Sequence, residues 1–131
     1  MKYEDALKAL KTATEKANEL NIAVTIAVVD AGGHLLALGR LDSVYGVIDL
    51  AIKKAKTAVM FGVESDIMGT IVSDAGIHGY GMLNSNNGIF TVAGGAVIKD
   101  KTGIIIGAIG SSGGTAEQDK EIALAGANLF N

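Results

Sequence analysis

The chain has 131 residues, a length that predicts one domain with a core and little room for a second domain. Apolar residues make up 49% of it and aromatic residues only 5%, so we expect a core of Ala, Val, Ile and Leu. The formal net charge of −3 argues against a nucleic-acid-binding protein. The absence of cysteine excludes thiolate catalysis, disulfides and cysteine metal sites in this chain.

The first residues, MKYEDALKALK, are charged and amphipathic and contain no apolar signal core. No apolar run approaches the roughly 18 consecutive residues of a membrane span. We therefore expect a cytoplasmic protein with no membrane partner. The mean hydropathy of +0.37 is high for so small a monomer, so we also expect a homo-oligomer that buries apolar surface between subunits.

The first half of the chain predicts a helix followed by a β-hairpin. Apolar residues at helical spacing (Tyr3, Leu7, Leu10, Ala13, Ala17, Leu20) predict an amphipathic helix over Tyr3 to Leu20. The β-branched run Ile22 to Val29 predicts a strand buried on both faces. The turn sequence DAGG at 30–33 then leads into a second strand, His34 to Arg40, in an antiparallel hairpin.

Helices are expected in the middle of the chain. The longer one runs from Tyr45 to Phe61 and is ended by Gly62. Its basic cluster (Lys53, Lys54 and Lys56) is interpreted as a solvated helix face rather than a binding patch. A shorter helix is expected from Asp66 to Ser73, with Ser65 as its N-cap.

The second half begins with a stretch that has no periodicity, Gly76 to Gly88, which predicts a loop long enough to be functional. After it we expect the strands Ile89–Val92, Gly95–Lys99 and Ile104–Ile109, and a final helix over Thr115–Phe130. This element order predicts an α+β fold in which helices pack on the faces of a five-stranded, largely antiparallel sheet.

The glycine-serine turn at 110–115 raises the question of a bound nucleotide. Its glycine spacing does not match the dinucleotide fingerprint, and Glu117 and Asp119 in the following helical turn would repel a phosphate. A capping box formed by Thr115 and Gln118 explains the turn instead. We expect a structural turn, with a ligand-facing turn as the alternative.

The chain has only two histidines and one arginine. His78 lies in the glycine-rich loop near Tyr80 and Met82, where an imidazole suits an axial ligand to haem iron, although an ordinary loop histidine is the simpler interpretation. His34, beside a turn, is interpreted as a surface histidine. Arg40 is expected to pair with a buried carboxylate, or alternatively with a ligand carboxylate such as a propionate.

Three blocks of sequence, in this order, resemble the GlcG/HbpS family, the haem-degrading domain family that includes the C-terminal domain of PduO-type proteins. They are VVDAGGHLLALGRLD at 28–42, KKAKTAVMFG at 53–62 and IGAIGSSGGTAEQDKEIA at 106–123. The resemblance covers essentially the whole chain and implies a GlcG-like, profilin-like α+β fold and homo-oligomers, often octamers. The chain departs from the family in having Ala93 before Gly94 and Gly95, where relatives commonly have proline. It also lacks histidine in residues 1–20, where some haem-binding relatives have a ligand.

The resemblance implies a small haem- or tetrapyrrole-binding accessory protein, with a corrinoid as the alternative cofactor. His78 would be the axial ligand and Arg40 would face a propionate. The pocket would be walled by the turn at 110–115 and by glycines, namely Gly94, Gly95, Gly113 and Gly114 together with Thr115. Two alternatives stay open. One is an enzyme that degrades haem or acts on a small metabolite of glycolate, diol or cobalamin-linked metabolism, using Asp30, Arg40 or Asp119. The other is a cofactor-free assembly subunit.

Overall fold

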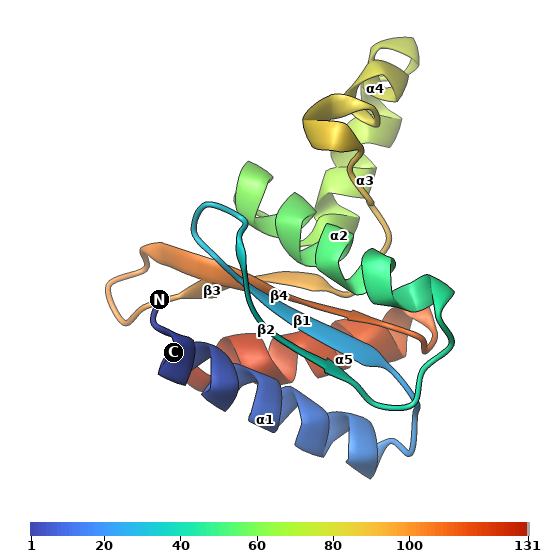
Figure 1. Ribbon diagram of the computed structural model, residues 1–131. Coiled ribbons are helices and arrows are strands. Elements are labelled where there is room, and N and C mark those ends of the chain that lie inside the picture. The colour runs from blue at the N-terminus through green and yellow to red at the C-terminus, as the bar shows by residue number, and fades with distance from the viewer. Residues whose placement is uncertain (131) are drawn as a thin grey trace.

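The computed structural model describes residues 1–130 and has helices on both faces of one antiparallel sheet (Figure 1). The sheet has four strands in the order β2-β1-β4-β3. In chain order the elements are α1 (Tyr3–Glu19), β1 (Thr25–Asp30), β2 (Leu35–Arg40), α2 (Gly46–Phe61), α3 (Ser65–Asp74), α4 (Ile77–Met82), the 3₁₀ helix η1 (Ser85–Asn87), β3 (Gly95–Lys99), β4 (Ile105–Ser112), α5 (Ala116–Ala127) and the 3₁₀ helix η2 (Asn128–Phe130). No helix within these residues is long and apolar enough to cross a membrane.

The two central strands are β1 and β4, which pair with each other and with one edge strand each. In β1 every residue except the last, Asp30, is buried. Thr25 lies opposite Arg40 of β2 on one side and Ser112 of β4 on the other. The unbroken apolar run therefore forms the doubly covered strand that the sequence predicted.

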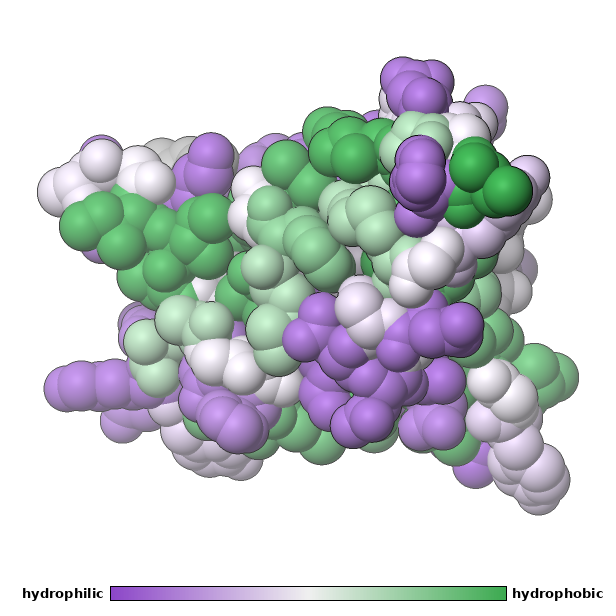
Figure 2. Space-filling view, turned by 90° about the horizontal axis from the view of Figure 1, so that it is seen from above, coloured by the Kyte–Doolittle hydropathy of each residue, from purple (hydrophilic) through white to green (hydrophobic). Residues whose placement is uncertain are grey.

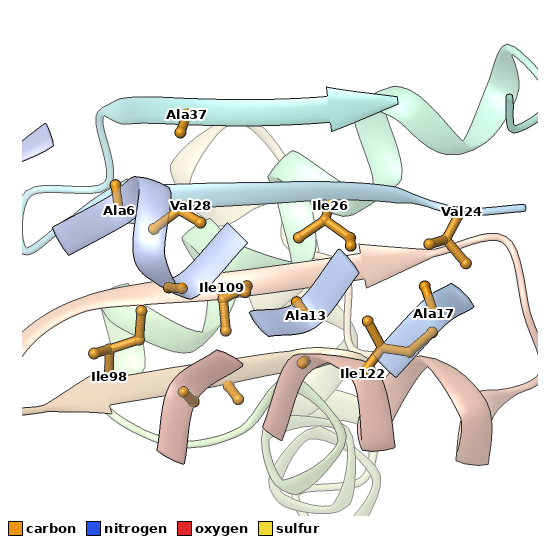
Figure 3. Packing of buried hydrophobic residues seen from close by; sticks show 14 residues of the cluster. Ala6, Ala13, Ala17, Val24, Ile26, Val28, Ala37, Ile98, Ile109 and Ile122 are labelled. Atoms are coloured by element: carbon orange, nitrogen blue, oxygen red, sulfur yellow. The ribbon is translucent and has the colours of Figure 1, made fainter. Parts of the chain in front are cut away.

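One face of the sheet is covered by α1 and α5, which lie side by side below it in Figure 1. The face of α1 that enters the core is lined with alanines, namely Ala6, Ala9, Ala13 and Ala17. Figure 3 shows Ala13 and Ala17 of α1 with Ile122 of α5 against strand residues such as Ile26 and Ile109. The prediction that Tyr3 and Leu7 belong to the buried stripe was wrong, because the small alanines allow a closer approach and leave those two side chains exposed.

The other face of the sheet is covered by α2. Ala55, Ala58 and Val59 of this helix pack against Val29 of β1 and Ala108 of β4. The helix ends as predicted at Gly62, which adopts a left-handed conformation and donates its N–H to the carbonyl of Ala58 at 2.8 Å.

Helices α3 and α4 stand out from the layers of the fold, as Figure 1 shows, and we call residues 65–82 the arm. The prediction of a loop over 76–88 was wrong, because Ile77–Met82 is helical and Ser85–Asn87 forms a 3₁₀ turn. Gly76, at a positive φ of 61°, ends α3 and reverses the chain. Gly79 then packs so closely on α3 that a Cβ there would lie 1.9 Å from the carbonyl oxygen of Val72.

The fifth strand, expected over Ile89–Val92, does not form, and the sheet has four strands. Side-chain hydroxyl groups, rather than a neighbouring strand, form hydrogen bonds with the backbone of this segment. The N–H of Phe90 donates to Thr57 Oγ1 at 2.9 Å, and the carbonyl of Val92 accepts from Ser65 Oγ at 2.6 Å. The segment is thereby fastened to α2 and α3.

The capping box predicted at the start of α5 is confirmed. Thr115 Oγ1 accepts a hydrogen bond from the N–H of Gln118 at 3.2 Å. The N–H of Thr115 in turn donates to Gln118 Oε1 at 3.0 Å. These two hydrogen bonds stabilise the start of α5, so the sequence of the turn at 110–115 is explained by helix capping.

Candidate functional site

His78 lies on α4, near the tip of the arm, with its side chain exposed. Its helix carries two of the most exposed large apolar side chains of the molecule, Ile77 at 81% and Tyr80 at 70%. Ile67 and Ile71 of α3 are also exposed. Figure 2 looks down on this side of the molecule and shows extended hydrophobic surface interrupted by polar patches. The arm therefore combines an accessible imidazole with an apolar surface.

A second polar feature is a buried ion pair between Lys54 of α2 and Asp119 of α5. Lys54 Nζ lies 3.1 Å from Asp119 Oδ2 and donates to the carbonyl of Ser111 at 2.9 Å. Burial lowers the pKa of the Lys54 ammonium, and the charge of Asp119 partly opposes that shift. The prediction of a solvated basic face holds for Lys53 and Lys56, which are exposed, but it was wrong for Lys54, which is 1% exposed.

Three of the predicted pocket glycines gather around this ion pair. A Cβ on Gly94 would lie 2.4 Å from the carbonyl oxygen of Ser111, and a Cβ on Gly95 would lie 2.2 Å from that of Lys54. The N–H of Gly114 donates to Asp119 Oδ1 at 2.9 Å. These glycines thus make close internal contacts that a side chain would prevent.

The two other residues of the predicted turn also have internal roles. Gly113 has a φ of 134°, and a Cβ there would lie 2.6 Å from the carbonyl oxygen of Ala23. Thr115 caps α5. The turn at 110–115 and the ion pair therefore form one packed unit. This unit meets the base of the arm, where the N–H of Gly95 donates to Ser65 Oγ at 2.9 Å, whereas His78 lies on the arm's second helix.

Arg40 is exposed at the end of β2, so the expectation of a buried carboxylate partner was wrong. Its Nε and Nη2 donate to the carbonyl of Ser43 at 3.0 and 2.8 Å. The guanidinium also lies 4.8 Å from the ring centroid of Tyr45. This end of β2 lies well below α4 in Figure 1, so the fold does not bring Arg40 and His78 together within one subunit.

The residues considered for polar catalysis lie apart from one another. Asp119 is buried in its ion pair. Asp30 and Arg40 lie at opposite ends of the β1–β2 hairpin, since Arg40 pairs with Thr25, five residues and roughly 17 Å from Asp30. Asp30 Oδ1 accepts hydrogen bonds from the backbone N–H groups of His34 and Gly32, both at 2.9 Å. These bonds, led by the one from His34, lower the pKa of the Asp30 carboxyl.

A cleft of about 240 Å³ lies between the β1–β2 turn, α2 and the segment after α4, and we call it the hairpin cleft. It is lined by Gly32, Gly33, His34, Lys56, Thr57, Met60, Asn86, Asn87, Gly88 and Ile89. His34 is exposed beside the turn, as the sequence predicted, and it also lines this cleft. The sequence did not predict the cleft, whose local signal is the Asn-Asn-Gly run, because Asn86 and Asn87 adopt the positive φ values that asparagine takes more readily than most residues.

The described residues hold no group of three or more His, Cys, Asp or Glu side chains that could together bind a metal ion. A metal that arrives inside a cofactor needs only an axial ligand, which one imidazole can supply.

Comparison with known proteins adds the family. The model of the family described as "Haem degrading protein HbpS-like" matches residues 1–128. The crystal structure of a PduOC:heme complex superposes with a TM-score of 0.89 at 29% identity, over all of this chain and 95% of that chain. A double mutant of Streptomyces reticuli HbpS superposes with a TM-score of 0.88 at 29% identity, over all of this chain and 87% of that one.

The chain is also 32% identical, over 124 residues, to the corrinoid adenosyltransferase PduO of Salmonella typhimurium. The match covers 94% of this chain but only 37% of that enzyme.

Proposed function

The chain belongs to the HbpS-like family, and from this premise we propose that it is a small accessory protein that binds haem. The observation that carries the proposal is the exposed imidazole of His78 on an apolar helix surface. The similarity to a protein crystallised as a heme complex supports it. The matched part of PduO is a minority of that enzyme, so its adenosyltransferase activity is not included in the proposal.

The residues of the arm fit a haem group in their chemistry. Haem iron takes an axial ligand such as histidine, and the porphyrin faces pack on apolar surface. His78 offers the ligand, and Ile77 and Tyr80 offer apolar surface. When bound, the iron would supply electron-transfer or oxygen chemistry. The hairpin cleft fits less well, because its volume of about 240 Å³ is below the roughly 300–1,000 Å³ of pockets that enclose a drug-sized ligand.

One arm covers only one face of a flat macrocycle, so we propose that a second copy of the chain covers the other face. The exposed Ile67, Ile71, Ile77 and Tyr80 support such an assembly. Arg40 lies away from α4 within one subunit, so its proposed role toward a propionate requires a neighbouring subunit. The octameric subunit number and the cytoplasmic location stay predictions.

The proposal is tested by titrating the purified protein with hemin and recording the Soret band. Wild-type protein should shift the band with saturation at stoichiometric hemin. His78→Ala should abolish the shift or weaken binding by at least about tenfold, since the iron loses its protein ligand. His34→Ala is the matched control, because it removes the other histidine of the chain and should titrate like wild type.

Each outcome bears on a separate part of the proposal. An unchanged hemin spectrum with wild-type protein would overturn haem binding. A His78→Ala variant that binds with the wild-type spectrum would overturn the assigned ligand. Sedimentation of His78→Ala without hemin should match wild type, which separates loss of the ligand from loss of assembly. Cobalamin in place of hemin should leave the absorption spectra additive; a saturable change would favour the corrinoid.

A further inference from the structure

We propose that the hairpin cleft binds a small organic carboxylate, independently of haem. The cleft lies between three segments that are distant in the sequence, the β1–β2 turn, α2 and η1 with the residues after it. Its charged and strongly polar lining groups are Lys56, His34, Asn86 and Asn87. No Asp or Glu is among the described residues that line it. The lining therefore favours an anion that can accept several hydrogen bonds.

Lys56 provides the positive charge. It lies on α2, two residues beyond the buried Lys54, and is exposed. A Cβ built on Gly33 would lie 3.9 Å from Lys56 Cγ, so the β1–β2 turn approaches the lysine stem to van der Waals distance. Asn86 and Asn87 add amide groups that can donate to carboxylate oxygens or accept from a ligand hydroxyl.

The β1–β2 turn favours a carboxylate over a phosphate. Backbone N–H groups of such a turn are the usual cradle for phosphate, but here Asp30 has already taken them. The N–H groups of Gly32 and His34 donate to Asp30 Oδ1, and that of Gly33 donates to the carbonyl of Asp30. The ionised Asp30 carboxylate beside His34 also repels a second negative charge. A monoanion held by side chains fits these constraints better than a dianion.

The shape of the cleft limits the size of the ligand. Its volume of about 240 Å³ corresponds to roughly eight water molecules at about 30 Å³ each, the space of a short-chain acid. Met60 and Ile89 provide apolar lining for the carbon chain. The backbone of Asn86 and Asn87 is left-handed, at φ values of 52° and 61°, a conformation that asparagine tolerates, and both residues line the cleft.

The test uses haem-free wild-type protein and amide NMR spectra recorded during titration with lactate, butyrate and inorganic phosphate at constant ionic strength. At least one of the two carboxylates should cause saturable shifts of the amides around the cleft, at Gly32, Gly33, Gly88 and Ile89. Lys56→Met should weaken that binding by at least about tenfold, because it removes the ligand's charge partner. Lys53→Met, an exposed lysine on the same helix that does not line the cleft, should bind like wild type.

A second variant guards against a loss of binding that comes from misfolding. Asn87→Asp keeps a residue that tolerates the positive φ but puts a negative charge into the cleft, so it should also weaken carboxylate binding by at least about tenfold. The site would be overturned if neither carboxylate caused saturable shifts. It would also be overturned if Lys56→Met bound the carboxylate as tightly as wild type. Phosphate binding as tight as carboxylate binding would overturn the ligand class. His78→Ala should leave the carboxylate titration unchanged, so that failure of haem binding and failure of this site are distinguishable.

Discussion

Lys54 carries an ammonium group into the interior of a small domain. The group has a carboxylate at 3.1 Å and a backbone carbonyl at 2.9 Å, contributed by Asp119 and Ser111. Two charges removed from water stabilise a fold only when each has such a partner, because desolvation costs several kcal/mol per ion. The pair joins α2 to α5 and to the end of β4, so its value is in fixing those elements relative to one another.

Removing one partner of this pair should be costly. Lys54→Met leaves Asp119 buried without its charge partner, and we expect the free energy of unfolding to fall by about 3–5 kcal/mol. The double variant Lys54→Met with Asp119→Leu should recover part of that loss. Recovery should be incomplete because the N–H of Gly114 then has no acceptor. Urea denaturation of wild type, both single variants and the double variant at one protein concentration measures the coupling.

Lys53→Met is the control for this cycle, since its side chain is exposed on the same helix and should change the free energy of unfolding by less than about 0.5 kcal/mol. A loss below about 1 kcal/mol for Lys54→Met, or single-variant losses that simply add in the double variant, would contradict a buried and coupled pair.

The sequence predicted some residues well and others not at all, depending on how local their interactions are. Thr115 and Gln118 are three residues apart and cap one helix, so their pattern is complete in the sequence. Lys54 finds its partner 65 residues away, and nothing near it in the chain distinguishes it from Lys53 and Lys56. A carboxylate partner was predicted for Arg40 because it is the one arginine of the sequence, but its guanidinium donates to a backbone carbonyl three residues away.

Within the arm, α4 is the part that local propensity does not explain, whereas the helix of α3 was predicted from the sequence. Helix α4 contains Gly79 and Gly81, and glycine costs about 1 kcal/mol relative to alanine inside a helix. The helix forms because Gly79 can pack against the backbone of α3 at Val72, where no other residue would fit. A pattern search over residues 76–88 sees only glycine and asparagine and therefore predicts a loop.

Replacing Gly79 by alanine should detach α4 from α3. The added Cβ would lie 1.9 Å from the Val72 carbonyl oxygen, and overpacking of this kind typically costs about 1–3 kcal/mol. We expect hydrogen exchange to accelerate in peptides covering 77–83 while peptides from β1 and β4 stay protected. Hydrogen exchange followed by mass spectrometry measures both regions in one experiment.

Gly81→Ala is the matched control on the same helix. A Cβ at Gly81 meets nothing within 4 Å, so alanine should add helix propensity of about 1 kcal/mol without a clash. Exchange in 77–83 should then be slower than in wild type. Equal behaviour of the two alanine variants would show that contact with α3 does not hold α4 in place.

The missing fifth strand has a similar origin in distant contacts. Residues 89–92 have the apolar, β-branched character of a strand, but Thr57 and Ser65 supply the hydrogen bonds that a neighbouring strand would have supplied. Both hydroxyl groups belong to helices that precede the segment by about 30 residues, so local pattern could not reveal them. The strands with two sheet neighbours, β1 and β4, were predicted because their burial leaves a continuous apolar run.

At the scale of the whole molecule, the α+β class and the antiparallel sheet followed from the order of the elements and from the family resemblance. The positions of the candidate site residues relative to one another did not follow from either. The turn at 110–115 lies on the ion pair, His78 lies on the arm, and His34 lies in the hairpin cleft. These positions depend on how α2 and the arm are placed over the sheet, which is a tertiary property.

The arm also makes a prediction about assembly. Four large apolar side chains on it, Ile67, Ile71, Ile77 and Tyr80, are between 43% and 81% exposed. Exposed apolar side chains that gather in this way are typical of surfaces that a partner covers. A specific interface buries about 800 Å² per partner. We expect sedimentation velocity at micromolar concentration to give a species heavier than the 13.3 kDa monomer. Ile77→Lys combined with Tyr80→Lys should shift it to smaller species, because burying two ammonium groups in the interface opposes association.

Tyr3→Lys separates this effect from a general change of surface charge, since Tyr3 is 58% exposed but lies on α1, on the other side of the sheet from the arm. That variant should sediment like wild type. A monomeric wild-type protein would overturn the proposed assembly. If Tyr3→Lys dissociated the protein as much as the arm variant does, the interface would not be on the arm. If the arm pairs with a second copy, His78 lies within or beside the interface, and hemin should then raise the fraction of assembled protein in wild type but not in His78→Ala.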